Sequence, residues 1–413
     1  MGAPDRSMLT HHVDAVRQRS LMLAAPLSDE DCGAQSMPDA SPVKWHLAHT
    51  TWFFETFILE RFEAGFQPFN PAFRVLFNSY YNGIGERHPR AQRGLLTRPS
   101  MSEVRAYRAN VDARIAALLQ TRADQNTIAQ LLELGLHHEQ QHQELILTDI
   151  KHMLAQSALY PCYTTQPLAC ARAPQALAWL AFDGGLVDIG HDGAGFCFDN
   201  ELPRHRQYVA PFSLASRLVT NGEYLAFIEA GGYRDPALWL SEGWDRVCEL
   251  KLSHPLYWRP DEDGAGGWHE FTLHGLAPLD LARPVTHLSL YEAAACAIFM
   301  GARLPTEAEW ELAAQGMPVQ AGDVHPAAAS DQEGVLAQMF GACWQWTSSS
   351  YAPYPGYAAA PGALGEYNGK FMLNQYVLRG SSCATPPGHS RASYRNFFPA
   401  GARWQFTGLR LAR

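Results

Sequence analysis

The chain is long, acidic and poor in lysine, and these properties exclude several classes of protein. Its 413 residues favour two domains, each large enough for its own interior. A net charge of -9 argues against the phosphate backbone of a nucleic acid as a partner. No stretch approaches the roughly twenty apolar residues of a membrane helix, and the N-terminus lacks the apolar segment of a secretory signal. We therefore expect a cytoplasmic protein with small-molecule partners, whose oligomeric state the sequence leaves open.

The first 160 residues carry the pattern of a helical bundle. Apolar residues recur at helical spacing over 7–25, 41–62, 101–124 and 127–156. In the second of these segments Ser41 is expected to cap the helix, with the following proline at the first helical position. Four helices of this kind favour a four-helix bundle.

The connection between the second and third helices, residues 70–99, is rich in Pro, Gly, Arg and Tyr. Loops of about thirty residues inside a compact domain are generally either functional or disordered. The tyrosines and apolar residues favour a functional loop.

After residue 160 the composition changes to Gly, Trp and Pro with short apolar runs. This texture is typical of a compact domain with much irregular backbone and short helices and strands. The predicted fold is therefore α+β with two domains. The helical bundle occupies 1–160, a linker 161–180 and the second domain 181–413.

Two histidines in the segment "HHEQQHQE" have the spacing of a metal site. His138 and His142 lie four residues apart, on one helix face that continues the apolar stripe into the bundle. His49 lies on the inward stripe of the second helix. Three inward imidazoles predict a half-open metal site with positions left for substrate. The alternative is a set of core histidines satisfied by hydrogen bonds. Three further histidines fall off the stripes and are expected at the surface or behind the ligands: His46, His137 and His152.

The same letters match the H-E-x-x-H pattern of zinc peptidases, in which Glu139 would be the general base. That class needs a third ligand, from a Gly and His just beyond or a Glu on a following helix, and "QELILTDIKHML" offers no such glycine. Glu139 also lies about 100° around the helix from His138, away from the metal-facing stripe. We therefore disfavour the peptidase and expect Glu139→Gln to leave most activity in place.

Several motifs together resemble one known family over nearly the full chain. "SPVKWHLAHTTWFFE" and "HHEQQHQE" resemble the DinB-like metal-binding bundle of the ergothioneine-biosynthesis sulfoxide synthases. "DNELPRH", "GARLPTEAEWELAA", "VLRGSSC" and "YRNFFPAGARWQFTGLRLAR" resemble the formylglycine-generating-enzyme (sulfatase-modifying factor) domain, which has a C-type-lectin-like fold. Several independent motifs in the right order make a strong signal.

The resemblance implies a non-haem iron(II) oxidoreductase. Members of the family use O2 to join a cysteine-type thiol to C2 of the imidazole of hercynine (N-alpha-trimethylhistidine), and they leave a sulfoxide. By resemblance, His49, His138 and His142 match the three iron(II) ligands. Tyr80 and Tyr81 in "NSYYNG" resemble loop tyrosines near the iron, where a phenol donates a proton or hydrogen atom during C–S bond formation. The alternative is that these tyrosines only pack the loop.

The resemblance also implies substrate-binding residues. Arg87 and Arg90 fall where the carboxylates of the thiol substrate bind, a task that suits the guanidinium fork. Gln141 matches a glutamine that contacts the imidazole of hercynine. Asn396 matches an asparagine that holds its carboxylate region. Two aromatic residues follow Asn396 and suit a trimethylammonium group, which is attracted by aromatic faces: Phe397 and Phe398.

One departure from the family concerns the sulfur donor. Members that use gamma-glutamylcysteine tend to carry an aspartate where Phe398 stands, so we expect free cysteine as the donor. Use of gamma-glutamylcysteine stays an alternative, as does an ovothiol-type sulfoxide synthase that acts on histidine. A non-catalytic module that binds a metal and a ligand is a remote alternative. A formylglycine-generating oxidase needs a late pair of copper-binding cysteines, and no cysteine follows Cys383.

Overall fold

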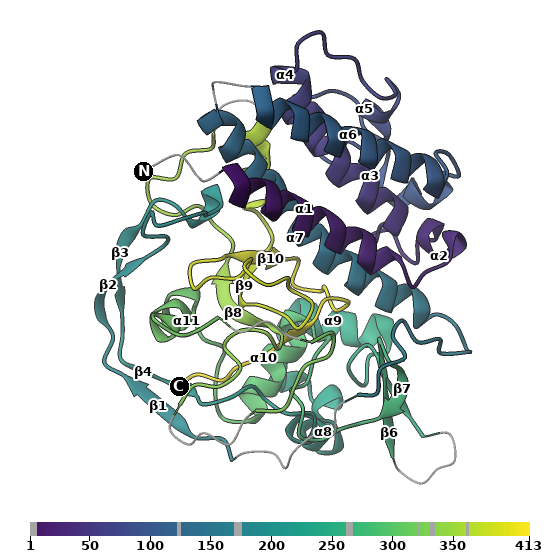
Figure 1. The fold of residues 1–413 in the computed structure, drawn as a ribbon. Helices are drawn as coiled ribbons and strands as arrows, with labels where there is room; N and C mark the ends of the chain where they lie inside the picture. The colour runs from purple at the N-terminus through teal and green to yellow at the C-terminus, as the bar shows by residue number, and fades with distance from the viewer. Residues whose placement is uncertain are drawn as a thin grey trace. The chain divides into compact units, whose positions relative to one another are not determined.

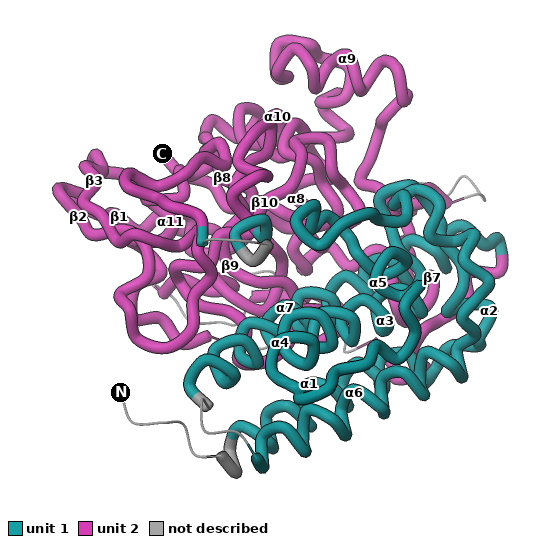
Figure 2. The backbone as a smooth tube through the Cα atoms, turned by 90° about the horizontal axis from the view of Figure 1, so that it is seen from above, with its two compact units in different colours: residues 1–158, 360–367 teal, residues 159–359, 368–413 magenta. Residues whose placement is uncertain are grey.

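In the computed structural model, whose fold is drawn in Figure 1, the chain forms two compact units, which Figure 2 shows in different colours. Unit 1 comprises residues 1–158 and 360–367, and unit 2 comprises 159–359 and 368–413. The predicted α+β class with two domains is confirmed, whereas the predicted boundaries stay predictions. The structure describes residues 6–121, 125–168, 176–261, 267–319, 323–329, 335–360 and 363–413, so residues 169–175 of the predicted linker lie outside it. Within these ranges no helix is long and apolar enough to cross a membrane.

Four long helices build unit 1, as the apolar periodicity predicts. They are α1 (Arg6–Ala24), α3 (Val43–Phe54), α6 (Met101–Thr121) and α7 (Gln125–Leu154). Helix α3 packs against both α6 and α7, and α1 packs against α7. Gly135 permits the close approach of α3 and α7, because a Cβ there would lie 2.7 Å from a ring carbon of Phe54. This approach brings the histidines of the two helices within reach of each other.

Helix α3 begins one residue later than predicted. Pro42 is its N-cap and makes no side-chain capping bond, so the predicted Ser41 cap is wrong. The groups of Ser41 are engaged elsewhere: its backbone N–H donates to Asp149 at 2.9 Å, and its hydroxyl accepts from Arg93 at 2.8 Å. The helical path then continues through a π-helix, η1 (Glu55–Leu59), into α4 (Glu60–Phe62).

The long connection before α6 is ordered around Asn78. It contains a short helix, α5 (Phe73–Leu76), and a 3-10 helix, η2 (Arg90–Leu95); another short helix, α2 (Asp29–Gly33), follows α1. The fully buried amide of Asn78 donates to the carbonyl of Tyr81 at 3.0 Å and accepts from its N–H at 3.0 Å. Asn78 therefore closes the turn that carries the two adjacent tyrosines.

Unit 2 combines small sheets with short helices. The largest sheet has the order β10-β9-β8-β11, with β11 parallel to β8 and the other pairs antiparallel. Antiparallel strands form the remaining sheets, β1-β4, β2-β3 and β5-β6-β7. The strands are β1 (Trp179–Phe182), β2 (Gly185–Ile189), β3 (His205–Val209), β4 (Phe212–Ala215), β5 (Trp258–Pro260), β6 (Trp268–Thr272), β7 (Gly275–Pro278), β8 (Trp344–Ser350), β9 (Tyr376–Gly380), β10 (Asn396–Phe398) and β11 (Thr407–Gly408).

The helices of unit 2 are α8 (Asn221–Glu229), α9 (Ser241–Leu250), α10 (Leu290–Phe299) and α11 (Glu307–Ala314). Three of them, α8, α10 and α11, begin with a capping box in which a Ser or Thr and a Glu three residues later satisfy each other's backbone N–H groups. An apolar cluster that includes Trp310 and Phe340 forms part of the core.

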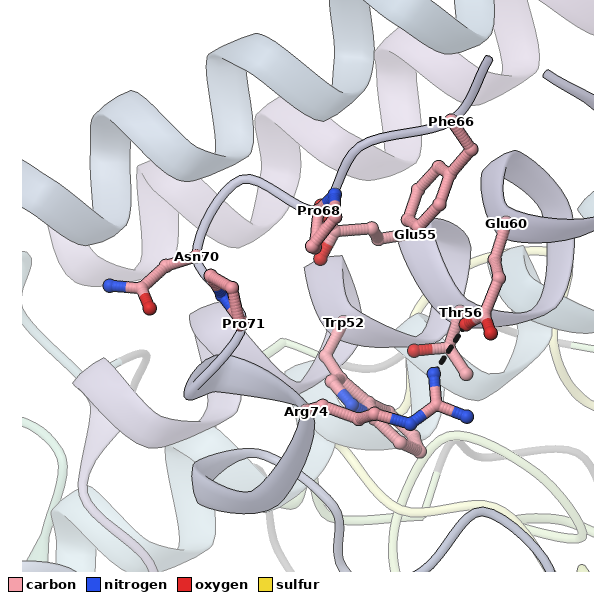
Figure 3. Close-up of a pocket in the computed structure, with 9 residues that line it drawn as sticks. All are labelled: Trp52, Glu55, Thr56, Glu60, Phe66, Pro68, Asn70, Pro71 and Arg74. Carbon is pink, nitrogen blue, oxygen red and sulfur yellow. Dashed lines mark hydrogen bonds and ion pairs between the residues drawn. The ribbon is translucent and has the colours of Figure 1, made fainter. Parts of the chain in front are cut away.

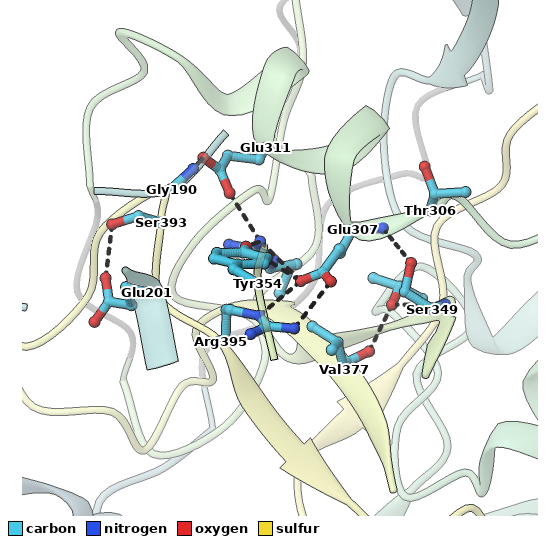
Figure 4. Close-up of polar contacts among 12 residues, drawn as sticks. Gly190, Glu201, Thr306, Glu307, Glu311, Ser349, Tyr354, Val377, Ser393 and Arg395 are labelled. Carbon is cyan, nitrogen blue, oxygen red and sulfur yellow. Dashed lines mark hydrogen bonds and ion pairs between the residues drawn. The ribbon is translucent and has the colours of Figure 1, made fainter. Parts of the chain in front are cut away.

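A buried network of charged side chains ties the large sheet of unit 2 to α11 (Figure 4). Glu307 accepts from Arg395 at 2.9 Å and from Arg379 at 3.0 Å, and Arg379 also donates to Glu311 at 2.8 Å. A fully buried guanidinium is tolerated only with such partners. Because Arg379 lies on β9 and Arg395 directly precedes β10, the network holds the strand that carries Asn396.

Candidate metal centre

Three imidazoles from two helices converge inside unit 1. His49 comes from α3, and His138 and His142 come from α7; their ligand nitrogens all lie within 4.8 Å of one another. The Nε2 atoms of His49 and His138 are 3.2 Å apart. Two imidazole nitrogens that share one metal at about 2.1 Å would lie roughly 3.0 to 3.4 Å apart. The structure thus brings together the three residues that the sequence predicted to meet.

The ring of His49 is held by two stacked tryptophans and by a hydrogen bond at one nitrogen. Trp45 stacks on it with ring centroids 4.5 Å apart, and Trp52 stacks on it at 5.6 Å. Its Nδ1 lies 2.6 Å from the carbonyl oxygen of Phe77 and donates its proton there. The lone pair of His49 is therefore on Nε2, which faces the other two histidines.

Burial keeps the three imidazoles neutral. It lowers the pKa of His138 to about 3, and it lowers the pKa values of His49 and His142 well below the usual value for histidine. Neutral histidine is the form that binds a metal. His49 and His138 are fully enclosed, whereas His142 keeps part of its surface accessible. The site is thus closed on the ligand side and open near His142.

These residues fit a metal ion with positions left for other ligands. The donor set is three neutral nitrogens, and the 3.2 Å between the Nε2 atoms of His49 and His138 matches two nitrogens on one ion. Three nitrogen ligands and an open side characterise catalytic rather than structural metal sites. Imidazole suits iron, zinc and copper alike, so the donor set defines a transition-metal site without selecting one ion.

Glu139 takes no part in this cluster. Its carboxylate is fully buried and accepts hydrogen bonds from Arg17 at 2.9 Å, from Ser20 at 2.5 Å and from Arg108. Burial alone would raise the pKa of Glu139, but the charges of Arg108 and Arg17 lower it to about 2. Glu139 joins α7 to α1 and α6. Its carboxylate therefore stabilises the packing of these three helices and does not serve as the general base of a peptidase.

Three tyrosines gather beside the histidines in unit 1. Tyr81 is completely buried, and its ring lies 5.6 Å from that of Trp52 and 4.6 Å from that of Tyr80. The third is Tyr367, whose ring lies 6.4 Å from Tyr80 and 5.7 Å from His138. Burial, with the neighbouring Tyr80, raises the pKa of Tyr81 well above its usual range, so its phenol keeps its proton.

No pattern in the sequence marks Tyr367 as part of this site, because it comes from a segment far along the chain. Residues 360–367 belong to unit 1 although both flanks belong to unit 2 (Figure 2). They include the 3-10 helix η6 (Ala363–Glu366). The carboxylate of Glu366 accepts from the backbone N–H groups of Asn82 and Gly83 at 2.9 and 2.7 Å. This contact joins the segment to the tyrosine turn.

Gln141 lies on the same side of α7 as the tyrosine cluster. The hydroxyl of Tyr367 donates a hydrogen bond to the amide oxygen of Gln141. The predicted contact of Gln141 with an imidazole substrate stays a prediction. Its side chain is held by a tyrosine, so its orientation is set before any substrate arrives.

The arginines of the long loop occupy two different environments. Arg87 and Arg90 are exposed, and Arg90 donates a hydrogen bond to the backbone carbonyl of Asp39. Arg93 is buried, and its guanidinium lies 3.3 Å from the ring centroid of Trp45. Burial, with the nearby charge of Arg90, lowers the pKa of Arg93 to about 9. The predicted grip of Arg87 and Arg90 on a carboxylate stays a prediction.

The predicted residues of the second domain lie on strand β10 of unit 2. Asn396 accepts a hydrogen bond from the N–H of Phe397 at 2.9 Å. The ring of Phe397 stacks on Tyr351 with centroids 4.1 Å apart, and Phe398 lies 5.9 Å from Trp404. All three residues are partly exposed. Their predicted contacts with hercynine stay predictions.

A pocket of about 220 Å³ lies within unit 1, beside Trp52 and the π-helix η1 (Figure 3). None of the three histidines lines it. Its carboxylates are engaged within the protein: Glu55 accepts from the hydroxyl of Tyr107 at 2.5 Å, and Glu60 pairs with Arg74 at 2.5 Å. We assign no ligand to this pocket. Its lining residues are Trp52, Glu55, Thr56, Glu60, Phe66, Pro68, Asn70, Pro71 and Arg74.

Comparisons with known proteins match both units and the full chain. The DinB superfamily matches residues 12–146, and the sulfatase-modifying factor enzyme 1-like domain matches 169–335 and 324–413. A hercynine oxygenase of Mycolicibacterium smegmatis is 31% identical over 98% of this chain and 99% of its own length. A hercynine oxygenase of Mycobacterium tuberculosis is 30% identical over 100% of this chain and 99% of its own length. A formylglycine-generating enzyme of Streptomyces coelicolor is 31% identical over 40% of this chain and 55% of that enzyme.

The fold and the site thus define a two-domain protein with a DinB-like bundle, a buried cluster of three histidines and a sulfatase-modifying-factor domain. Two relatives that match nearly the whole length of this chain are 31% and 30% identical to it. The chain belongs to the hercynine oxygenase family, the sulfoxide synthases of ergothioneine biosynthesis.

Proposed function

We propose that the chain is an iron(II)- and O2-dependent sulfoxide synthase that joins cysteine to C2 of hercynine. The observation that carries the proposal is the cluster of His49, His138 and His142, neutral and open on one side, in a chain whose full-length relatives bear the name hercynine oxygenase. In this reaction a C–H and an S–H bond break and a C–S and an S=O bond form. O2 accepts four electrons and supplies the sulfoxide oxygen and one water.

Bound iron(II) would supply a centre at which O2 accepts these electrons while the thiol and the imidazole are held close together. The protein contributes neutral ligands on one side and a partly accessible edge at His142. Gln141, whose amide oxygen accepts a hydrogen bond from Tyr367, would bind the imidazole of hercynine. Proximity and orientation of this kind supply much of the rate enhancement when two substrates react.

The two adjacent tyrosines of the long loop, Tyr80 and Tyr81, are proposed as proton donors. Tyr81 stays protonated at neutral pH, because burial raises its pKa, and Tyr80 stacks directly on it. A phenol in this place can give a proton or hydrogen atom to reacting oxygen, which favours C–S bond formation over oxidation of the thiol alone. We assign this role first to Tyr81 and Tyr80, as the sequence predicts.

The proposed sulfur donor is free cysteine. Phe398 presents an aromatic ring and no charge for the ammonium group of gamma-glutamylcysteine, whereas the exposed guanidinium groups of Arg87 and Arg90 suit a small carboxylate. At matched concentrations, turnover with cysteine should exceed turnover with gamma-glutamylcysteine. The opposite order would overturn the assignment of the donor and leave the reaction class intact.

The function is tested by loading the full-length protein with iron(II) without oxygen, adding hercynine and cysteine, and measuring O2 uptake together with the product mass. The expected result is one O2 consumed for each hercynylcysteine sulfoxide formed. Histidine in place of hercynine is the discriminating control, because an ovothiol-type enzyme would use it in preference. Metal binding without O2 uptake or adduct would contradict the proposal and support a non-catalytic binding module.

A further inference from the structure

A fourth histidine lies directly behind the metal cluster. His46, one helical turn before His49 on α3, is buried, and its Nδ1 lies 2.8 Å from Nδ1 of His142. On its other side, Nε2 of His46 lies 3.0 Å from an oxygen of Asp149. Asp149 is also buried and is held in place by the backbone N–H of Ser41 at 2.9 Å. The three side chains form one hydrogen-bonded chain from the cluster to a carboxylate.

The carboxylate and the neutral form of the two imidazoles together assign the protons in this chain. An ionised carboxylate only accepts hydrogen bonds, so the Nε2 of His46 must carry a proton and donate it to Asp149. A neutral imidazole carries one proton, which leaves Nδ1 of His46 as an acceptor. Nδ1 of His142 must then be the donor, and its lone pair stands on Nε2. Asp149 thereby selects, through His46, the form of His142 whose Nε2 is free to bind a metal.

We propose that His46 and Asp149 are positioning residues that hold His142 in its metal-binding tautomer and ring orientation. Metal-bound histidines commonly donate their second N–H to a carboxylate or carbonyl, and loss of such a partner weakens metal binding by about 10- to 100-fold. Here the carboxylate of Asp149 does not contact His142 directly but acts through the imidazole of His46. The inference rests on the metal-binding part of the proposed function and is independent of its substrates.

The surroundings of the chain favour this role. The Arg93 guanidinium donates to the hydroxyl of Ser41, whose N–H holds Asp149, and it covers the face of Trp45, which stacks on His49. The same group of side chains therefore supports two of the three candidate ligands. His49 has its own acceptor, the carbonyl of Phe77, so each of these two ligands has a separate partner for Nδ1.

The proposal is tested with Co²⁺ as a spectroscopic probe of the metal-free, full-length protein. Affinity and the visible ligand-field spectrum are measured for the parent, His46→Phe, Asp149→Ala, the double variant and His46→Gln. His46→Phe should bind Co²⁺ about 10- to 100-fold more weakly than the parent, with an altered spectrum. His46→Gln, whose amide oxygen can accept from His142, should bind more tightly than His46→Phe. The double variant should bind no more weakly than His46→Phe alone, because Asp149 acts through His46.

His152→Phe is the matched control. His152 lies on α7, the helix that also carries His142 and Asp149. Its Nδ1 lies 2.8 Å from the hydroxyl oxygen of Ser36 and takes no part in the hydrogen-bonded chain from His142 to Asp149. This variant should keep the parental affinity and spectrum. Three results would each overturn the proposed role of His46 and Asp149. They are parental Co²⁺ affinity in His46→Phe, equal affinities in His46→Gln and His46→Phe, and a double variant whose loss of affinity is the product of the two single losses. A parent that binds no Co²⁺ would instead overturn the metal site, and with it the proposed function.

Discussion

The hydroxyl of Tyr367 donates a hydrogen bond to the side-chain oxygen of Gln141, although 226 positions separate the two residues in the chain. Tyr367 belongs to a short segment of the second half of the sequence that is part of the helical unit. Gln141 directly precedes the candidate ligand His142. The contact therefore connects the two halves of the chain at the candidate metal centre, within one compact unit.

Tyr367→Phe should release Gln141 and weaken its hold on hercynine. We expect kcat/KM for hercynine to fall by about tenfold in total, mainly through a higher KM, because one hydrogen bond is worth roughly 1 kcal/mol or somewhat more and about 1.4 kcal/mol corresponds to a factor of ten. Metal content should not change. Steady-state kinetics and metal analysis check this, with Tyr357→Phe as control, since that hydroxyl donates to Asp199 in unit 2. Parental kinetics in Tyr367→Phe would remove Tyr367 from the site.

Tyr81→Phe should shift the outcome of the reaction more than its overall rate. Without the phenol as proton donor, we expect less sulfoxide and more oxidation of cysteine to its sulfinate, with O2 uptake retained. The ratio of the two products, measured by mass spectrometry, checks this. Tyr80→Phe serves as the comparison, because Tyr80 is the more exposed member of the stacked pair. An unchanged product ratio in both variants would mean that these tyrosines only pack the loop.

Glu139→Gln should destabilise the bundle without removing the chemistry. The substitution removes the carboxylate that pairs with the buried Arg108 and one of the two that pair with Arg17, the other being Asp112. Breaking buried ion pairs of this kind costs about 3 to 5 kcal/mol. Thermal unfolding should show a lower midpoint, while each folded, metal-loaded molecule keeps most of its turnover. The exposed Glu133, two turns earlier on α7, provides the control Glu133→Gln, which should behave as the parent. If Glu139→Gln lost its turnover while it kept the parental stability and metal content, Glu139 would have a direct part in the reaction.

The metal-free protein should lose stability as the pH falls below about 6.5. Burial lowers the pKa of His138 to about 3 and lowers those of His46, His49 and His142, so these groups stay neutral in the folded state while they gain protons when unfolded. The unfolded state then binds more protons, so the free energy of unfolding falls between pH 6.5 and pH 3. Each such histidine contributes a loss of about 1.4 kcal/mol per pH unit.

Thermal unfolding at a series of pH values measures this effect. Above pH 6.5 these histidines should no longer change the free energy of unfolding, because they are neutral in the unfolded state as well. Ligation by a metal should deepen the dependence, because protons compete with the ion for the same nitrogens. A midpoint that stays constant from pH 7.5 to pH 4.5 would contradict the buried, neutral state of these imidazoles.

The sequence predicted the bundle and the histidine cluster because both depend on helical periodicity. His138 and His142 are neighbours on any helix, and His49 lies on the inward face of a strongly apolar one. It also placed Glu139 off the metal-facing side. It could not predict the environment of Glu139, because Arg17 and Arg108 come from two other helices that only tertiary packing brings together.

The remaining differences arise from contacts between distant residues. Ser41 looked like a helix cap, but its N–H binds Asp149, a residue more than a hundred positions away, and the helix starts one residue later. No local pattern around Tyr367 marks it as part of the helical unit. His46 was expected at the surface or behind the ligands, and it lies behind His142. Its partner Asp149, which comes from another helix, could not be predicted from its position off the inward stripe.

The proposed function requires that His49, His138 and His142 hold the iron at which hercynine and cysteine react. It is tested most directly by measuring bound iron(II) per chain and sulfoxide formed per chain in the parent and in His49→Ala. We expect one iron per chain and steady product formation in the parent, and neither in a folded His49→Ala protein. Stoichiometric iron and parental product formation in His49→Ala would contradict it.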